Sequence, residues 1–245
     1  MKIFFCLTFI CILFANIVQA AESLTIAVAA NFALPFADIG TAFEKKSGIS
    51  VQATVSSTGK LYAQIKNGAP YDLFFAADSL RPELLFQEGL GSLPVVYARG
   101  LPVLWTADKK FCGKRSWQEA FTAQGVKKIG IANPKTAPYG ESSAKALRLA
   151  GLWDESLSKM VFAGNVGQSA QYAYMGSVTM SFVAASFAVS SQGQKGCFWH
   201  IPEVETVIQK ACIVTRSAKK DMAAQFLSFL DSLEAREILM RYHYQ

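Results

Sequence analysis

The pattern of apolar and polar residues near the start of the chain predicts a strand followed at once by a helix. An apolar, partly β-branched run at 24–29 has the composition of a buried strand. Apolar residues then recur every three or four positions, at Phe36, Ile39 and Phe43. Because Pro35 is tolerated only near a helix start, the helix begins close to Asn31 and ends near 47–48.

The same order of elements repeats further along. A strand at 49–55, a turn at 56–59 and a helix ending at 67–68 lead to a third strand at 72–77, which is apolar enough to be covered on both faces. Strands that alternate with helices in this way are typical of a doubly wound α/β unit with a mainly parallel sheet.

A second block of the same kind begins near 101–105. Its predicted elements are a strand at 129–132, a loop at 133–140, a helix at 141–149, a turn at 165–167, a helix to 175 and a strand at 179–184. Two helices at 218–242 complete the chain. We therefore expect two α/β lobes with a cleft between them: lobe I from 21–100 with 204–245, and lobe II from 101–203.

The first 20 residues predict a cleavable secretory signal peptide. Lys2 precedes an apolar run, and small residues stand before a cut expected after Ala20. The run is shorter than the ~20 residues of a membrane anchor. Phe5 and Ile10 precede the two cysteines of this segment, where a lipoprotein needs a small residue. These features predict export to the periplasm.

Composition and charge narrow the function classes. With 245 residues, 51% hydrophobic and 17% charged, the chain buries a large core and is not a disordered tail. Removal of the signal peptide takes away one charge, Lys2, so the net charge falls by one from +6. The remaining basic residues are scattered, which excludes a nucleic-acid footprint.

Three cysteines remain after the predicted cut: Cys112, Cys197 and Cys212. The exported compartment permits disulfides, so one bridge and one free thiol are expected. We favour Cys112 with Cys197, although spacing alone does not establish the pairing. The sequence has no CxxC pair and no Cys/His cluster, so it predicts neither a structural zinc site nor a cofactor.

Residues for catalysis are scarce. The two histidines, His200 and His243, are far from the loops that follow strands, which argues against a Ser-His-Asp triad. Ser142 and Lys145 fit an SxxK pattern, but the companion SDN and KTG elements are absent. An exported serine hydrolase using these two residues is kept as the alternative from a different class.

Four turns between strands and helices carry small, hydroxylated or amide residues, at 30–31, 56–59, 138–140 and 165–167. Each presents unpaired backbone N–H groups at a helix start, where the helix dipole also favours an anion. Any one of them also fits an ordinary helix cap. Together they are consistent with a site for one deprotonated oxyanion, which accepts hydrogen bonds and gains nothing from a carboxylate.

At these turns the sequence resembles the periplasmic molybdate-binding proteins, the type II solute-binding components of molybdate ABC importers. The resemblance extends from about Leu24 to Tyr242. It is most specific at 29–32, 57–65, 67–78, 133–140 and 165–168.

In the first lobe the resemblance implies four oxyanion-binding positions. Asn31 occupies the first ligand position and offers its backbone N–H and its side chain. Ala30 stands where some members have a threonine hydroxyl. Thr58 occupies the second position, and Ser57 beside it is a weaker candidate.

In the second lobe Tyr139 and Val166 match positions that donate backbone N–H groups. Ala184 stands where one branch of the family has a tyrosine hydroxyl, so that donor is missing. Asp72 and Asp78 recur in the family, but we interpret them as structural, because a buried carboxylate would repel an oxyanion.

The resemblance therefore implies a monomeric binding protein that captures molybdate, with tungstate as a second ligand, and delivers it to a membrane permease. Molybdenum enters only as the bound oxyanion, with no direct protein ligand. Sulfate or another tetrahedral oxyanion is the alternative within the binding proteins.

Overall fold

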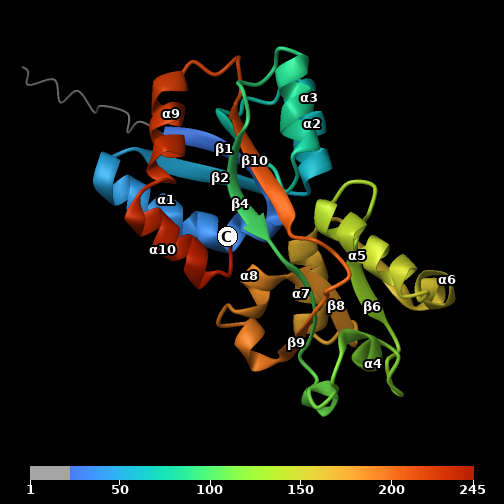
Figure 1. Ribbon diagram of the computed structural model, residues 1–245. Helices are drawn as coiled ribbons and strands as arrows, with labels where there is room; N and C mark the ends of the chain where they lie inside the picture. Colours follow the sequence, from blue (N-terminus) through green and yellow to red (C-terminus); the bar gives the residue numbers. More distant parts are fainter. Residues whose placement is uncertain (1–22) are drawn as a thin grey trace, which may run out of the picture.

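The computed structural model describes residues 23–245, which form two lobes joined by strands that pass from one to the other (Figure 1). Each lobe is built on a five-stranded sheet with helices packed against it. The predicted signal peptide at 1–20 lies outside the described residues. Within 23–245, no helix has the length and apolar character needed to cross a membrane.

The sheet of the first lobe has the strand order β2-β1-β3-β10-β4. Its strands are β1 (Ser23–Ala29), β2 (Ser50–Ser56), β3 (Leu73–Phe75), β4 (Val95–Gly100) and β10 (Val207–Ile213). The helices are α1 (Ala33–Ser47), α2 (Thr58–Lys66), α3 (Leu80–Gln87), α9 (Lys220–Phe229) and α10 (Leu233–Arg241), and the short 3-10 helix η1 (Ala30–Phe32) leads into α1.

The sheet of the second lobe has the order β7-β6-β8-β5-β9. Its strands are β5 (Pro102–Thr106), β6 (Ile129–Ala132), β7 (Met160–Ala163), β8 (Met180–Ala184) and β9 (Cys197–His200). The helices are α4 (Trp117–Phe121), α5 (Pro138–Leu149), α6 (Trp153–Ser156), α7 (Val166–Tyr174) and α8 (Ala185–Ala188). Three 3-10 helices complete the lobe: η2 (Lys109–Phe111), η3 (Leu157–Lys159) and η4 (Gly193–Lys195).

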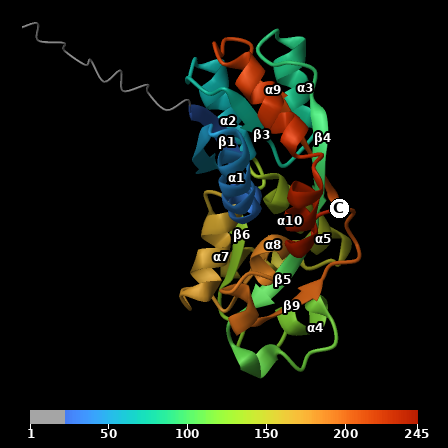
Figure 2. The same ribbon diagram turned by 90° about the vertical axis from the view of Figure 1, so that its left-hand side faces the viewer.

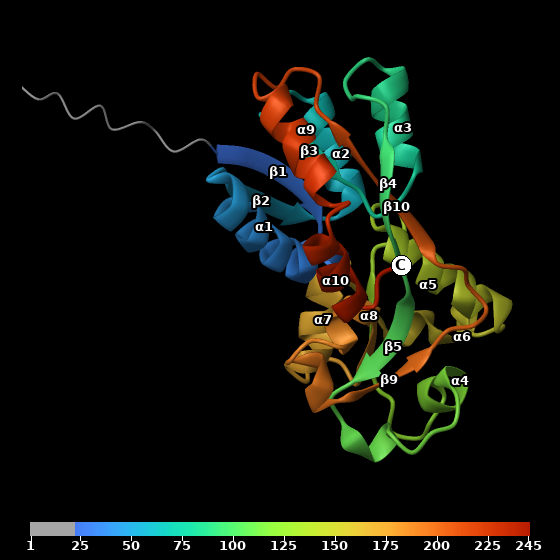
Figure 3. The same cartoon turned by 60° about the vertical axis from the view of Figure 1, so that its left-hand side comes forward.

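The expectation of mainly parallel sheets is confirmed: in each sheet four of the five strands run in one direction, and one strand, β10 or β5, runs opposite to them. In the first sheet β1 pairs in parallel with β2 and β3, but β10 is antiparallel to both β3 and β4. The second sheet repeats this, with β6 parallel to β7 and β8 and with β5 antiparallel to β8 and β9. The antiparallel pairings involve the strands next to the crossovers. Only Leu101 separates β4 from β5, and the chain returns from β9 to β10 (Figure 3).

Most predicted helices are present with shifted ends. The helix predicted at 141–149 begins earlier, at Pro138, because proline fits the first helical position. The first long helix ends where predicted: Gly48 caps α1 with a φ of 76°, a left-handed conformation that glycine adopts without strain. The two C-terminal helices are confirmed as α9 and α10.

The two lobes have separate hydrophobic cores. In the first lobe, β1, β3 and β10 pack against α1, α9 and α10 through a chain of aromatic rings; Phe32 stacks on Phe75 with ring centroids 5.8 Å apart. On the other face of that sheet, α2 and α3 cover residues such as Phe74. In the second lobe Trp105 and Trp117 are fully buried on opposite faces.

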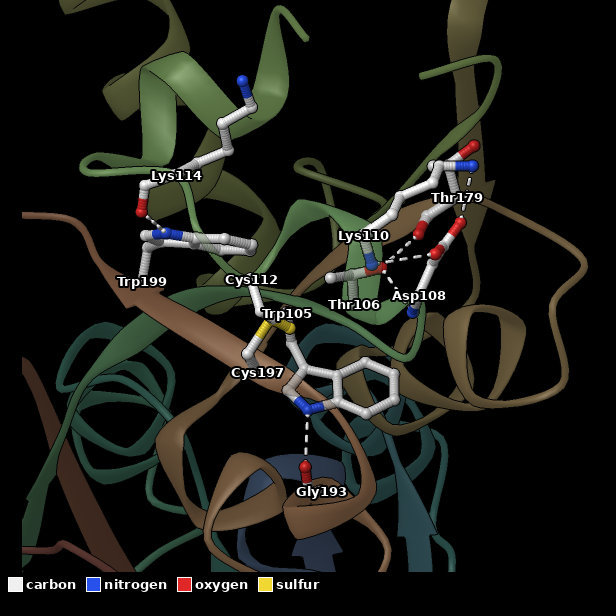
Figure 4. Close-up of a disulfide and its surroundings, with 10 residues drawn as sticks. All are labelled: Trp105, Thr106, Asp108, Lys110, Cys112, Lys114, Thr179, Gly193, Cys197 and Trp199. Carbon is white, nitrogen blue, oxygen red and sulfur yellow. Dashed lines mark hydrogen bonds and ion pairs between the residues drawn. A yellow bond between two sulfur atoms is a disulfide. The ribbon is translucent and has the colours of Figure 1, made fainter. Parts of the chain in front are cut away.

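The predicted disulfide between Cys112 and Cys197 is present in the second lobe (Figure 4). It joins the end of η2 to the first residue of β9, next to Trp105. Cys212 is the free cysteine within 23–245, and it is buried on β10. Burial raises the pKa of its thiol to about 12, so this cysteine stays protonated and unreactive near neutral pH.

Candidate functional site

Four helix starts, two from each lobe, meet at the junction of the lobes. The first lobe supplies the starts of η1 and α2, and the second supplies those of α5 and α7. In Figure 2 the start of α1 lies directly above α7, with the lobes stacked one on the other. Each start leaves backbone N–H groups without an intrahelical partner. The fold thus points the positive ends of several helix dipoles at one place.

A small cavity lies where these starts meet, with a volume of about 10 Å3. That is the room needed by one water molecule, so the lobes are closely shut in this structure. All six residues proposed from the sequence line the cavity: Ala30, Asn31, Ser57, Thr58, Tyr139 and Val166. The structure therefore brings together residues that are as far as 136 positions apart in the chain.

The first lobe contributes two hydroxyl groups, and they differ in what they contact. Thr58 Oγ1 accepts a hydrogen bond from the backbone N–H of Ala77, with 3.0 Å between the two atoms, so its own hydrogen is available to a ligand. Ser57 is 3% exposed, and its Oγ has no hydrogen-bond partner. A buried polar atom without a partner costs free energy, which favours a ligand that accepts a hydrogen bond from Ser57.

Asn31 and Ala30 form the other first-lobe edge of the cavity. The side-chain nitrogen of Asn31 donates to Gln209 Oε1 at 2.8 Å and to Tyr244 Oη at 3.0 Å. Both amide hydrogens are therefore used inside the protein, which departs from the expectation that this side chain donates to the ligand. The backbone N–H at the helix start remains, because η1 offers it no partner. Ala30 adds no side-chain donor.

The second lobe presents backbone groups. Tyr139 and Val166 stand in the first turns of α5 and α7, where the N–H groups are not used within the helix. Asn165 caps α7 by accepting a hydrogen bond from the N–H of Gln168 at 2.8 Å. Ser143 donates its hydroxyl to the carbonyl oxygen of Tyr139 and so is already engaged in α5.

The lining of the cavity carries no charged side chain among the residues that the structure describes. Asp72 accepts hydrogen bonds from Thr25 N and Ser217 Oγ at 2.8 and 2.6 Å, outside the cavity. Asp78 accepts a hydrogen bond from the backbone N–H of Arg81 in the first turn of α3 and forms an ion pair with the Arg81 guanidinium. Over 23–245, no group of three or more His, Cys, Asp or Glu is placed to hold a metal ion. The site is therefore electrically neutral and rich in donors.

Small apolar residues surround these donors. Ala29, Ala77, Ala132, Ala137 and Ala184 are all at most 4% exposed and pack with Tyr139 and Val166. Exclusion of water lowers the local dielectric, which strengthens hydrogen bonds to a charged acceptor. Alanines also let backbones approach closely, so the N–H groups of both lobes come near the same small cavity.

Comparison with known proteins assigns the family. Residues 24–245 match the model of the bacterial extracellular solute-binding proteins. The chain belongs to this family. A molybdate-binding protein of Azotobacter vinelandii is 36% identical to it, with 95% of this chain and 93% of that protein covered. A molybdate-binding protein of Rhodobacter capsulatus is 32% identical, with coverage of 92% and 89%. The solved structure of the Azotobacter vinelandii periplasmic molybdate-binding protein superimposes with a TM-score of 0.86, 31% identity and coverage of 91% and 98%.

Membership of the solute-binding family confirms the expected type II binding-protein architecture and decides against the hydrolase alternative. The relatives are named as binding proteins and not as enzymes. Neither Ser142 nor Lys145 lines the cavity; both stand on α5 beyond its first turns. The SxxK match is therefore a coincidence of helix composition.

Some residues that line the solute-binding cavity were not among the predicted ligands. They include Ala77, Ala137, Pro138 and Asn165, of which Pro138 and Asn165 belong to two of the predicted turns. Alanine carries no chemical signal in a sequence, and these residues contribute close packing and not donors. Gln209 and Tyr244, which contact Asn31, lie far from every motif and gave no local pattern.

Proposed function

We propose that this solute-binding protein captures molybdate, and tungstate with it, in the cavity between its lobes and delivers it to the permease of an ABC importer. The ligand of the named relatives supports this proposal. In it, lobe I comprises 21–100 with 204–245, and lobe II comprises 101–203. The anion is held by Asn31, Ser57, Thr58, Tyr139 and Val166, with Ala30 in contact.

The main support for the proposal is that uncharged hydrogen-bond donors line the cavity and that one of them is a buried hydroxyl without a partner. Ser57 Oγ lacks a partner, and no carboxylate lines the cavity. A phosphate that keeps a proton needs an acceptor, whereas a fully deprotonated tetrahedral oxyanion needs donors alone. Hydrogen bonds to a charged partner contribute roughly 1.5–3 kcal/mol each, so several of them support sub-micromolar binding.

Lobe closure fits this role. Gly59 N donates to Thr136 O across the cleft at 2.9 Å, which joins the start of α2 to the loop before α5. The shut cavity is smaller than a tetrahedral oxyanion, so the lobes must separate slightly to admit it. An anion that contacts both lobes favours the closed state over an open one by its differential affinity.

Export is part of the proposal. The signal peptide at 1–20 is cut after Ala20, and the mature monomer acts in the periplasm. The match to extracellular solute-binding proteins supports export. The closed form is the state that the permease recognises, because only that form carries the anion.

A thermal-shift series tests the proposal. Mature protein is heated with molybdate, tungstate, sulfate or phosphate. A ligand at roughly 1,000 times its dissociation constant stabilises the fold by ~4 kcal/mol. We expect large shifts with molybdate and tungstate and small ones with the other two. A shift with sulfate and none with molybdate or tungstate would assign the site to sulfate instead.

A matched pair of substitutions tests the site. Thr58→Val removes one hydroxyl from the cavity at nearly constant shape, and we expect molybdate affinity to fall about tenfold or more in calorimetric titration. Thr41→Val is the control, because Thr41 Oγ1 donates to Ala37 O on the exposed side of α1. Equal affinities of the two variants would remove Thr58 from the site.

A further inference from the structure

A cluster of six polar side chains lies buried behind the anion site. It consists of Asn31, Tyr97, Tyr139, Ser186, Gln209 and Tyr244, which are all at most 8% exposed. We call it the buried polar cluster. Two of its members, Asn31 and Tyr139, also line the cavity; the others do not. A set of hydrogen-bonded polar groups at this depth is costly unless each group is satisfied, so its position invites a functional explanation.

Asn31 is fixed from two sides by the cluster. Its side-chain amide nitrogen donates to Gln209 and Tyr244. Its backbone carbonyl oxygen accepts from Tyr244 Oη and from Ser186 Oγ, both at 2.8 Å. With its amide nitrogen and carbonyl both held, the residue cannot rotate. Its backbone N–H is therefore held at the start of η1, where the cavity lies.

Gln209 connects Asn31 to the second lobe. Its Oε1 accepts from Asn31 Nδ2 and from Tyr97 Oη, both at 2.8 Å. Its Nε2 donates to Tyr139 Oη at 3.3 Å. One side chain of β10 thus contacts a residue at each of two helix starts, one from each lobe.

The cluster also adjoins a crossover between the lobes. Gly100 ends β4, just before the chain enters the second lobe. A methyl group added there would overlap the Tyr139 hydroxyl and the Gln209 amide. The C-terminal Tyr244 lies beside the same crossover, since Gln245 exchanges backbone hydrogen bonds with Arg99 at 2.7 and 3.1 Å. Movement of the lobes about this crossover therefore changes the geometry of the cluster.

We propose that Gln209 and Tyr244 are positioning residues, which hold the helix starts at Asn31 and Tyr139 in the geometry that binds the anion when the lobes are shut. This inference rests on the proposed function, since it concerns the same cavity. Neither residue touches the anion. Each acts through Asn31, and Gln209 also through Tyr139.

The protonation of the tyrosines agrees with this role. Burial, more than any neighbour, raises the pKa of the Tyr97, Tyr139 and Tyr244 hydroxyls above the usual range. They stay protonated at physiological pH, so the hydroxyls of Tyr97 and Tyr244 remain donors. The cluster therefore introduces no negative charge beside the oxyanion.

The test compares two Tyr→Phe substitutions two positions apart. Tyr244→Phe removes both hydrogen bonds to Asn31 and keeps the ring that packs edge-on against Phe32. Tyr242→Phe is the control, because Tyr242 Oη donates to Asp38 Oδ2 away from the cavity. The readouts are the molybdate dissociation constant, the molybdate dissociation rate and the Tm of the ligand-free protein.

For Tyr244→Phe we expect about tenfold weaker molybdate binding, mainly through faster dissociation, because two neutral hydrogen bonds are lost. The Tm of the ligand-free protein should also fall below that of Tyr242→Phe, because Asn31 loses two buried partners. A purely structural role would lower that Tm alone and leave the dissociation constant of the folded protein unchanged. An affinity within about threefold of wild type would overturn the inference.

A second variant keeps the test decisive if Tyr244→Phe does not fold. Ser186→Ala removes the hydrogen bond from the second lobe to Asn31 O and the long one from Tyr244 Oη to Ser186 Oγ, but leaves both Tyr244 contacts to Asn31 in place. We expect about threefold weaker binding, again with faster dissociation, and unchanged dissociation would count against the cluster. If the wild-type protein binds no molybdate, that result contradicts the proposed function. Only a comparison of variants with a wild-type protein that binds molybdate contradicts the positioning role.

Discussion

The two lobes contribute to the site in different ways. The first lobe supplies the hydroxyls, Ser57 and Thr58, and it contains four of the six members of the buried polar cluster. The second lobe supplies backbone N–H groups at Tyr139 and Val166, and it contains the disulfide. Side-chain changes in the first lobe should therefore alter binding, whereas changes in the second lobe away from the cavity should alter stability.

Removal of the disulfide should give the largest effect and should separate stability from binding. The bond closes a loop with a sequence separation of 85 residues. Replacement of Cys112 and Cys197 by serine should lower the free energy of unfolding by about 2–5 kcal/mol. Urea denaturation measures this loss, and calorimetry on the folded variant should find molybdate affinity unchanged. Weakened binding at full stability would show that the disulfide positions the site.

A methyl group at Gly59 should disturb closure without disturbing the fold of either lobe. The added carbon would lie 3.0 Å from the carbonyl oxygen of Thr136 in the opposite lobe, closer than ordinary contact. Gly59→Ala should therefore weaken molybdate binding by about tenfold, the effect of a clash of ~1–3 kcal/mol. Alanine also favours helix formation, so the Tm of the ligand-free Gly59→Ala protein should be unchanged or higher than that of wild type.

Gly113→Ala in the second lobe is the control for that measurement. No atom lies within 4 Å of a methyl group at Gly113, so calorimetric titration of this variant should match wild type. If Gly59→Ala binds molybdate as tightly as Gly113→Ala does, the contact between Gly59 and Thr136 does not limit closure.

The free thiol of the first lobe should give the smallest effect near neutral pH, because its contribution to stability changes only in alkali. Burial raises the pKa of Cys212 to about 12, above its ordinary value of 9.0. The folded state therefore holds the proton more tightly than the unfolded state. Stability from this group is complete below pH 9 and falls as the pH rises from there toward 12, by about 1 kcal/mol per pH unit.

Comparison of wild type with Cys212→Ala measures this dependence. The free energy of unfolding of the wild-type protein should decline more steeply above pH 9 than that of the variant. The native thiol should also resist alkylation at pH 8, in contrast with the unfolded protein. Parallel pH profiles for the two proteins would contradict a buried, protonated Cys212.

The sequence predicted the elements whose partners are near in the chain. The turns at Asn31, Thr58, Tyr139 and Val166 follow strands directly, and each turn contains residues that favour a helix start. Parallel strands joined by a helix bring such turns to the same edge of a sheet, so their meeting could be inferred. The pairing of Cys112 with Cys197 was favoured correctly, but it needed the structure to establish it.

The sequence alone did not predict the antiparallel strand of each sheet or the buried polar cluster. β10 pairs with β3 across more than 130 positions, and its sequence, with a buried Gln209, has no clean apolar alternation. Asn31 and Tyr244 are separated by 213 positions. No local pattern predicts such contacts, because they depend on how the two lobes pack and not on the propensities of neighbouring residues.

In the proposed complex, donors from both lobes hold one tetrahedral oxyanion. A crystal structure of the mature protein grown with molybdate tests it most directly, since anomalous scattering locates molybdenum without reference to the protein. We expect one molybdenum peak per chain, inside the cavity, with oxygens at hydrogen-bond distance from the hydroxyls of Ser57 and Thr58 and from the N–H groups of Tyr139 and Val166. Molybdenum bound elsewhere, or contacts to one lobe alone, would contradict it.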